Sequence, residues 1–246
     1  MEPLEYADRL IKDISPDDDM FAGDGQKWYF EAGKNGLESI VVAIGGRIDQ
    51  VKNILDLPCG YGRVLRYLVA FFKDANIFAC DLNRSAVDFC VKTFGVQGVY
   101  SHIDFSRVEF DRKFDLVWCG SLLTHFSERF WDDFLGFITS NLEKNGVVVF
   151  TVHGRIAAYL AEQKNDVYGL DERQLESVVS GYRKTGFGYV NYSDDNPHYG
   201  ISLASPAWVV KKLQSSPDLQ IISFREHAWG HHDVYAISKV PPAYIV

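Results

Sequence analysis

Two glycines and two aspartates in this sequence have the spacing of a ligand-binding loop. Gly60 and Gly62 lie in the segment Asp-Leu-Pro-Cys-Gly-Tyr-Gly-Arg at positions 56–63, and Asp81 follows Gly60 by about 20 residues. Because glycine lacks a Cβ and adopts positive φ readily, this loop can let a ligand lie against bare backbone. The helix expected after it offers free N–H groups at its start. The pattern therefore predicts a cofactor cradle.

The elements around the loop are predicted from apolar periodicity. A short apolar run before the loop suits a buried strand, the proline and glycines interrupt that run, and apolar residues then recur at helical spacing. The strand residues are Ile54, Leu55 and Leu57, and the helix residues are Val64, Leu65, Leu68 and Phe72. We expect a strand, a tight loop and a helix.

The residues beside the glycines narrow the choice of cofactor. A dinucleotide fingerprint needs a third glycine where Leu65 stands, and the Gly-Lys-Ser/Thr ending of a P-loop is absent. Asp56, just before the loop, repels phosphate and suits a cationic amine. Asp81 stands where an open α/β sheet places a carboxylate that accepts hydrogen bonds from ribose hydroxyls. The alternative for Asp81 is a helix cap, although Asn83 and Ser85 offer caps nearer the next helix.

The loop with its two aspartates resembles the class I S-adenosylmethionine-dependent methyltransferases. The resemblance implies an α/β fold with a Rossmann-like, seven-stranded, mostly parallel sheet, helices on both faces and a closing antiparallel strand pair. It also implies S-adenosyl-L-methionine as the cofactor and S-adenosyl-L-homocysteine as the product. The cofactor contacts expected in this region are Asp56, Pro58, Cys59, Gly60, Gly62, Arg63, Asp81 and Leu82.

Further cofactor contacts follow from the same resemblance. A third strand over Gly98–Ile103 leads into Asp104, which in the family receives the adenine amino group, although Asp is also a common turn residue. Ile103 and Phe105 would flank the adenine ring. The segment Phe-Asp-Leu-Val-Trp at positions 114–118 resembles the buried fourth strand of the family, and the residues after it would lie on the ligand side of the sheet. These residues are Cys119, Gly120 and Ser121.

An aromatic stretch near the N-terminus is similar to the leader of bacterial methyltransferases associated with glycan and secondary metabolism. In those proteins the leader folds over the cofactor, with an aromatic residue near its methionine portion. Tyr29, in a helix expected to run from an Asp24 cap to Ile44, is the candidate for that contact. The alternative is a helix whose aromatic residues only pack on the sheet edge.

Two histidines are catalytic candidates on the acceptor side. His153 follows the predicted strand Val147–Val152, at the carboxyl end where open α/β sheets bind ligands. His125 lies after the fourth strand, although a lone histidine is more often a hydrogen-bonded structural residue. His198, in the long passage that ends at Gly200, is expected to face the substrate if that passage folds inward.

We expect a single methyltransferase domain over residues 1–246. Its parts are an N-terminal helical cap (1–50), a cofactor-binding core (51–154), a substrate-side insertion (155–204) and a C-terminal helix with a strand pair (205–240). Local patterns predict a first helix over Leu4–Ile14 and a turn at Asn145-Gly146. They also predict final strands over Leu219–Phe224 and Val234–Ile237. From Arg155 to Gly200 the pattern weakens to a helix through Leu160, a possible second helix from Asp171 to Tyr182 and a glycine- and tyrosine-rich passage.

Charge and composition limit the partners. The chain has a formal net charge of -8 and no dense cluster of Lys and Arg, which argues against a nucleic-acid partner. The N-terminus does not resemble a signal peptide, and no apolar stretch is long enough for a membrane span. We therefore expect a cytoplasmic protein with no membrane partner and with a small-molecule or glycan substrate. The oligomeric state is left open.

The cysteines and the C-terminal histidines give no recognised metal or disulfide pattern. Four cysteines lie in or beside apolar runs without a Cys-x-x-Cys pair, as reduced buried thiols do. His227, His231 and His232 fall across a strand, a turn and a strand, and no carboxylate or thiol completes a ligand set. No metal site is therefore predicted.

The function implied by the resemblance is methyl transfer by in-line displacement to a small-molecule or glycan acceptor, as O- or N-methylation. Such an enzyme supplies alignment and a water-poor pocket, and it needs a general base only for a poor nucleophile. Two alternatives remain open. One is an NAD-dependent oxidoreductase on the same sheet, which Leu65 and Asp56 disfavour. The other is a catalytically silent, cofactor-binding partner protein.

Overall fold

The computed structural model describes residues 6–193 and 199–240. The chain forms two compact units whose boundary falls between Trp118 and Cys119. The predicted fold class is confirmed, since seven strands belong to a mostly parallel, Rossmann-like α/β arrangement with helices around it, and two further strands form a small antiparallel sheet. The prediction for His198 lies outside the described residues.

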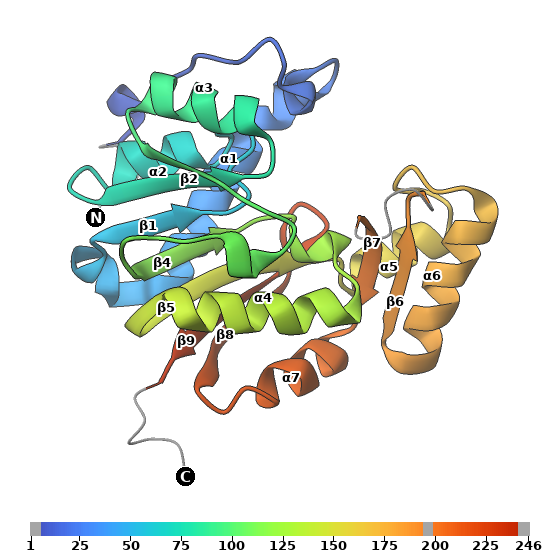
Figure 1. Cartoon of the computed structure of the whole chain (residues 1–246). Helices are drawn as coiled ribbons and strands as arrows, with labels where there is room; N and C mark the ends of the chain where they lie inside the picture. The colour runs from blue at the N-terminus through green and yellow to red at the C-terminus, as the bar shows by residue number, and fades with distance from the viewer. Residues whose placement is uncertain (1–5, 194–198, 241–246) are drawn as a thin grey trace. The chain divides into compact units, whose positions relative to one another are not determined.

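The first unit is built on parallel strands in the order β3-β2-β1-β4 (Figure 1). Within β1, Asp56 pairs with Ala79 of β2 on one side and with Trp118 of β4 on the other. Because the carboxyl ends of parallel strands meet at one edge, β1 and β2 deliver Asp56 and Asp81 to the same edge. The bounds are β1 Asn53–Asp56, β2 Asn76–Asp81, β3 Gln97–Tyr100, β4 Phe114–Cys119, α1 Gly25–Ile44, α2 Leu65–Phe71 and α3 Arg84–Phe94.

The predicted strand, loop and helix around the glycines are confirmed as β1 and α2 with the loop between them. The next helix, α3, shows how local chemistry sets helix ends. The Asn83 side chain accepts a hydrogen bond from the Ala86 N–H at its start, and Gly95 ends it with a φ of 69°. These are the residue types that favour a helix N-cap and a left-handed C-terminal turn.

The second unit contains β5 (Leu142–Val152), β9 (His232–Lys239) and β8 (Leu219–Trp229), which pair antiparallel in that order. The closing antiparallel pair is therefore confirmed as β8 and β9. Both strands run further than expected, because only Gly230 and His231 connect them and Gly230 supplies the positive φ (59°) of a two-residue hairpin turn. The expected turn at Asn145 is wrong, since this residue lies inside β5 with a φ of 66°. The helices of this part are α4 Glu128–Asn141 and α7 Pro206–Gln214.

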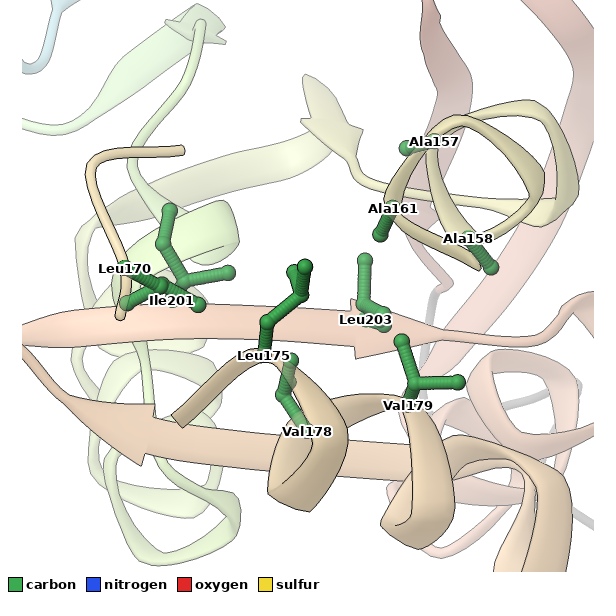
Figure 2. Close-up of a cluster of buried hydrophobic side chains, with 9 residues drawn as sticks. All are labelled: Ala157, Ala158, Ala161, Leu170, Leu175, Val178, Val179, Ile201 and Leu203. Carbon is green, nitrogen blue, oxygen red and sulfur yellow. The ribbon is translucent and has the colours of Figure 1, made fainter. Parts of the chain in front are cut away.

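The insertion folds around a small core of its own, in contrast to the weakly patterned passage seen in the sequence. It consists of α5 (Arg155–Glu162), α6 (Glu172–Thr185) and the antiparallel strands β6 (Phe187–Asn191) and β7 (Gly200–Ala204). Figure 2 shows side chains of α5, α6 and β7 converging on this core. Its buried members are Ala157, Ala158, Ala161, Leu170, Leu175, Val178, Val179, Ile201 and Leu203.

Helix α6 approaches β6 closely because glycines leave no Cβ atoms between them. A Cβ at Gly188 would lie 1.8 Å from the backbone oxygen of Val178, and a Cβ at Gly181 would lie 3.0 Å from the Cα of Gly188. Real Cβ atoms do not approach backbone atoms as closely as the first of these distances. The two glycines therefore permit α6 to pack directly against β6.

The helix expected over Leu4–Ile14 is wrong in its described part. Only Ala7–Arg9 form a 3₁₀ turn, and Leu10–Ile14 is not helical. The reason is a competing use of the backbone: Arg66 donates hydrogen bonds to the carbonyl oxygens of Ile11 and Asp13, both at 3.0 Å. The backbone of this segment is therefore organised around a buried guanidinium.

We expect Gly188→Ala to destabilise the fold, because the new methyl group collides with backbone; overpacking typically costs about 1–3 kcal/mol or more. The matched control is Gly136→Ala, in the interior of α4, where a Cβ meets no atom within 4 Å. Removing a helix-interior glycine should stabilise by about 0.5–1 kcal/mol. Urea unfolding midpoints measure both changes. Equal midpoints for Gly188→Ala and the wild-type chain would contradict the packing argument.

Candidate functional site

The loop between β1 and α2 holds both glycines in left-handed backbone, with φ of 48° at Gly60 and 82° at Gly62. A Cβ at Gly60 would meet no atom within 4 Å, so this position has the open space that a cofactor cradle needs. A Cβ at Gly62 would lie 2.4 Å from the Phe94 ring of α3. Gly60 therefore fits the predicted cradle, whereas Gly62 also serves packing against α3, and its contact with a cofactor stays a prediction.

The carboxylate of Asp81 is fixed at the end of β2 by backbone donors on both sides. Its Oδ2 accepts a hydrogen bond from the Gly60 N–H at 2.8 Å, and its Oδ1 accepts one from the Asn83 N–H at 2.9 Å. Burial raises the pKa of Asp81, while these backbone hydrogen bonds oppose the rise. The capping of α3 belongs to the Asn83 side chain, so the cap alternative for Asp81 is not what the structure shows. Each oxygen of Asp81 keeps a lone pair for a ligand.

Asp56 is a buried carboxyl group, 1% exposed, whose two oxygens have no hydrogen-bond partner among the described residues. Burial raises its pKa well above the ordinary value, the charge of Asp81 raises it further, and Arg63 opposes the rise. Leaving a buried polar group unsatisfied costs free energy. A ligand that donates hydrogen bonds or carries positive charge removes that cost, so Asp56 suits the cationic amine expected from the sequence.

Arg66 organises the loop, and the sequence reasoning did not single it out. Its side chain is 1% exposed, and its Nε donates to the carbonyl oxygen of Gly62 at 3.0 Å. Its guanidinium also lies 5.2 Å from the centre of the Tyr29 ring and 5.2 Å from that of Phe94. A charged residue on the otherwise apolar helix α2 was the available signal, since a buried cation needs dedicated partners.

The remaining expected contacts at the ends of β2 and β3 stay predictions. Leu82 is 61% exposed and Ile103 is 42% exposed, so both offer apolar surface beyond the strand ends. Asp104 accepts hydrogen bonds from the backbone N–H and the hydroxyl of Ser106, which is the turn role considered as its alternative. Phe105 begins the 3₁₀ turn that Asp104 caps.

Other candidates in the first unit are buried or half-buried. Pro58 follows a cis peptide bond, and the Cys59 N–H donates to the carbonyl oxygen of Cys80. Tyr29 is 1% exposed, and its hydroxyl donates to Asp18 at 2.6 Å. The structure thus gives Tyr29 the packing role weighed as its alternative, and its contact with a cofactor stays a prediction. All four cysteines are buried, and none of them forms a disulfide.

The loop after β4 belongs to the second unit and contains a strained backbone position. Cys119 and Gly120 are buried, and Ser121 has a φ of 59°, which is uncommon for a residue with a side chain. The Ser121 N–H donates to the Thr151 hydroxyl of β5 at 2.8 Å. This hydrogen bond fixes the loop on β5. The role of these three residues at the cofactor stays a prediction.

His125 has the hydrogen-bonded, structural environment considered for it. Its Nδ1 lies 2.8 Å from the carbonyl oxygen of Gly200, which can only accept, so Nδ1 carries the proton. Its ring stacks on Tyr199 at 4.7 Å between centroids. Burial lowers the pKa of His125. The tie to Gly200 anchors the start of β7.

His153 is 4% exposed at the end of β5, and burial with the neighbouring histidines lowers its pKa to about 3. It is therefore neutral near pH 7 and a weak base, which disfavours proton abstraction by this residue. The structure places His153 beside His231 and His232, with one possible ligand atom of each residue within 4.8 Å of the others. The sequence reasoning missed this cluster, because it weighed the C-terminal histidines without one from β5.

None of the helices in the described ranges has the combination of length and apolar character that a bilayer crossing requires.

One family model matches the part of the chain that contains the loop and β4. Residues 54–146 match the family model described as a methyltransferase domain. The malonyl-[acyl-carrier protein] O-methyltransferase of Acetivibrio thermocellus is 25% identical over 108 residues, covering 42% of this chain and 36% of that protein. The phthiotriol/phenolphthiotriol dimycocerosates methyltransferase 1 of Mycobacterium ulcerans is 28% identical over 144 residues, covering 54% of this chain and 51% of that protein. The chain thus spans no more than 51% of the length of these curated relatives.

The fold has close counterparts among solved structures. One is the 1,6-didemethyltoxoflavin-N1-methyltransferase of Burkholderia thailandensis, solved with 1,6-didemethyltoxoflavin and S-adenosylhomocysteine bound. It aligns with a TM-score of 0.59 over 89% of this chain and 83% of that chain, at 13% identity, which shows a shared fold. Residues 54–146 thus match a methyltransferase domain, within a fold that this chain shares with S-adenosylmethionine-dependent methyltransferases.

Proposed function

We propose that this protein transfers a methyl group from S-adenosyl-L-methionine to a small-molecule or glycan acceptor. The observation that carries the proposal is the carboxylate of Asp81, pinned to the Gly60 N–H at 2.8 Å beside an open glycine position. This arrangement leaves acceptor lone pairs for ribose hydroxyls and bare backbone for the ligand to approach. The unpartnered carboxyl group of Asp56 supplies the place for a cationic amine.

The chemistry that S-adenosylmethionine supplies is an electrophilic methyl group on a sulfonium, which departs as a neutral thioether. The residues of this chain bind and orient the reactants. Asp81 holds the ribose, Asp56 attracts the amine, and the buried strand ends around them exclude water, which is the main contribution an in-line displacement needs. His153 is a neutral imidazole near pH 7, because its pKa is lowered to about 3, and this disfavours its use as a general base.

The acceptor atom is oxygen or nitrogen in this proposal. Support comes from the names of similar proteins, which include an O-methyltransferase and an N1-methyltransferase that was solved with its small-molecule ligand. Incubation with S-adenosylmethionine and a panel of hydroxyl and amine acceptors, followed by detection of S-adenosylhomocysteine, tests the activity. Absence of turnover with intact cofactor binding would favour the silent partner protein instead. A cytoplasmic location is kept as part of the proposal.

The oxidoreductase alternative is disfavoured by two observations. Leu65 stands where a dinucleotide loop needs its third glycine, and its side chain is fully buried, so it serves the core. Asp56 leaves an unpartnered carboxyl group beside the loop, where a pyrophosphate would be repelled. Calorimetric titration with S-adenosylmethionine and with NADH separates the two functions, and binding of NADH alone would reverse the assignment.

Asp81→Ala is expected to weaken S-adenosylmethionine binding by about 1.5–3 kcal/mol, because charge-assisted hydrogen bonds to the ribose are lost. Isothermal titration calorimetry measures the change. Asp74→Ala, an exposed carboxylate on the same unit, is the matched control and should bind as the wild-type chain does. Unchanged affinity in a folded Asp81→Ala variant would remove Asp81 from the site.

The two glycines should separate binding from folding. Gly60→Val should keep the fold and lose cofactor binding, because its side chain enters open space that the ligand needs. Gly62→Val should lower the unfolding midpoint instead, because its Cβ collides with Phe94. Circular dichroism melts and calorimetry distinguish these outcomes. A Gly60→Val protein that binds normally would show that the cradle lies elsewhere.

As the pH is lowered, cofactor affinity should begin to fall at a higher pH than it would if Asp81 had the ordinary pKa of an aspartate. Asp81 binds ribose as a carboxylate, and its raised pKa means that protonation begins above the usual range as the pH falls. Asp56, with a pKa raised in the same direction, adds to this loss. Calorimetry from pH 8 to pH 5 should show a shallower dependence in Asp81→Asn, which cannot titrate. Parallel curves for Asp81→Asn and Asp74→Asn would contradict the assignment.

A further inference from the structure

Three histidines meet at the end of the β5-β9 ladder because of strand register. The antiparallel ladder pairs Val152 with Asp233, so the next step of the register brings His153 opposite His232. His231 is the second residue of the two-residue turn that joins β8 to β9, and His232 follows it as the first residue of β9. The tertiary structure thus collects side chains that are about 80 positions apart in the sequence.

We propose that His153, His231 and His232 bind a divalent transition-metal ion of the zinc type. Each residue offers one nitrogen, and these three atoms lie within 4.8 Å of one another. Zinc bound to nitrogen at 2.0–2.1 Å in a tetrahedron separates its ligand atoms by about 3.3 Å, a contraction that side-chain rotation can supply. This inference does not depend on the proposed methyl transfer.

The ring arrangement is already close to that of a three-histidine site. The centroids of His153 and His232 are 4.7 Å apart, those of His231 and His232 are 4.7 Å apart, and those of His153 and His231 are 5.3 Å apart. Imidazoles that share one tetrahedral ion have centroids separated by about 5 Å, from the metal–nitrogen distance and the ring size. The observed centroid separations are close to this value.

Two of the nitrogens are buried and lack a partner among the described residues. They are Nδ1 of His153 and Nε2 of His231. The other nitrogen of His153 hydrogen-bonds the backbone of Ser202, an interaction that raises its pKa as a carbonyl acceptor does. That hydrogen bond places the ring proton on the other nitrogen and leaves Nδ1 with a free lone pair. Metal-bound histidines are typically held in this way.

His232 is oriented by a neighbour on β5. Its Nδ1 lies 3.2 Å from the hydroxyl of Thr151, and that hydroxyl accepts the hydrogen bond of the Ser121 N–H. The cluster is therefore tied through Thr151 to the loop after β4, which was expected to lie on the cofactor side. Tyr168 packs on the His153 ring, with centroids 4.6 Å apart, and helps to bury the cluster.

The protonation state suits a metal at neutral pH. Burial lowers the pKa of both His153 and His231, so these rings are neutral, which is the form that binds metal. The carboxylate of Asp166 acts on His231 in the opposite direction and adds negative potential that favours a cation.

Three imidazoles favour zinc, cobalt, nickel or copper over magnesium or calcium, which prefer oxygen ligands. Three protein ligands also leave a fourth position for water or for a hydroxyl, whose pKa the metal lowers.

The test uses the untagged full chain, stripped with EDTA, and titrates it with zinc chloride by calorimetry. Cobalt chloride in a parallel titration reports tetrahedral nitrogen ligation through its visible absorption. The wild-type chain should bind a single equivalent of zinc. His231→Ala should weaken binding by more than about 100-fold, because even loss of an outer-shell partner costs about 10–100-fold. His153→Ala should behave alike.

The matched control is His227→Asn on the same hairpin, which lies outside the cluster and should bind zinc as the wild-type chain does. Asparagine tolerates the positive φ of this position (50°). His153 is buried, so the His153→Ala substitution can unfold the protein. If circular dichroism shows that it does, the zinc affinity of the half-buried His231→Ala variant tests the proposal. Failure of the wild-type chain to bind a single equivalent, or equal losses in His231→Ala and His227→Asn, would overturn the proposal. Calorimetric titration of the stripped protein with S-adenosylmethionine measures cofactor binding without the metal. Failure of the metal site can therefore be distinguished from failure of the proposed function.

Discussion

The loop between β1 and α2 depends on the hydrogen bonds that the buried guanidinium of Arg66 donates. Its hydrogen bonds go to the carbonyl oxygens of Gly62, Ile11 and Asp13 and to the Tyr29 hydroxyl, rather than to a carboxylate. A buried cation is tolerated only where such acceptors surround it. One side chain therefore joins the N-terminal segment, helix α1 and the loop, and it prevents the N-terminal segment from using those carbonyls in a helix.

The two proposed ligand-binding regions of this chain differ in the kind of titratable group that is buried. In the first unit, Asp56 and Asp81 are carboxyl groups whose pKa is raised by burial, which favours a ligand with hydrogen-bond donors and positive charge. In the second unit, His153 and His231 have a lowered pKa and present neutral nitrogen lone pairs. Burial thus prepares acceptors for an organic cation in one place and for a metal ion in another.

Glycines in this chain have two separate uses that sequence spacing does not distinguish. Gly60 opens onto free space, as a ligand cradle requires, whereas Gly62 and Gly188 occupy positions where any Cβ would collide with Phe94 or with the backbone of Val178. Gly60 and Gly62 also have the positive φ that glycine adopts readily. Only the neighbours contributed by α3 and α6 reveal which glycines serve packing.

The structural features that depend on residues close together in the chain could be predicted from the sequence. The strand, loop and helix around Gly60 and the caps of α3 follow from local propensity, and the place of Asp81 follows from the spacing of one strand from the next. The role of Arg66, the β6-β7 pair and the three-histidine cluster were decided by tertiary structure. Their partners come from segments far apart in the chain, and antiparallel register brings such residues together only after the strands have paired.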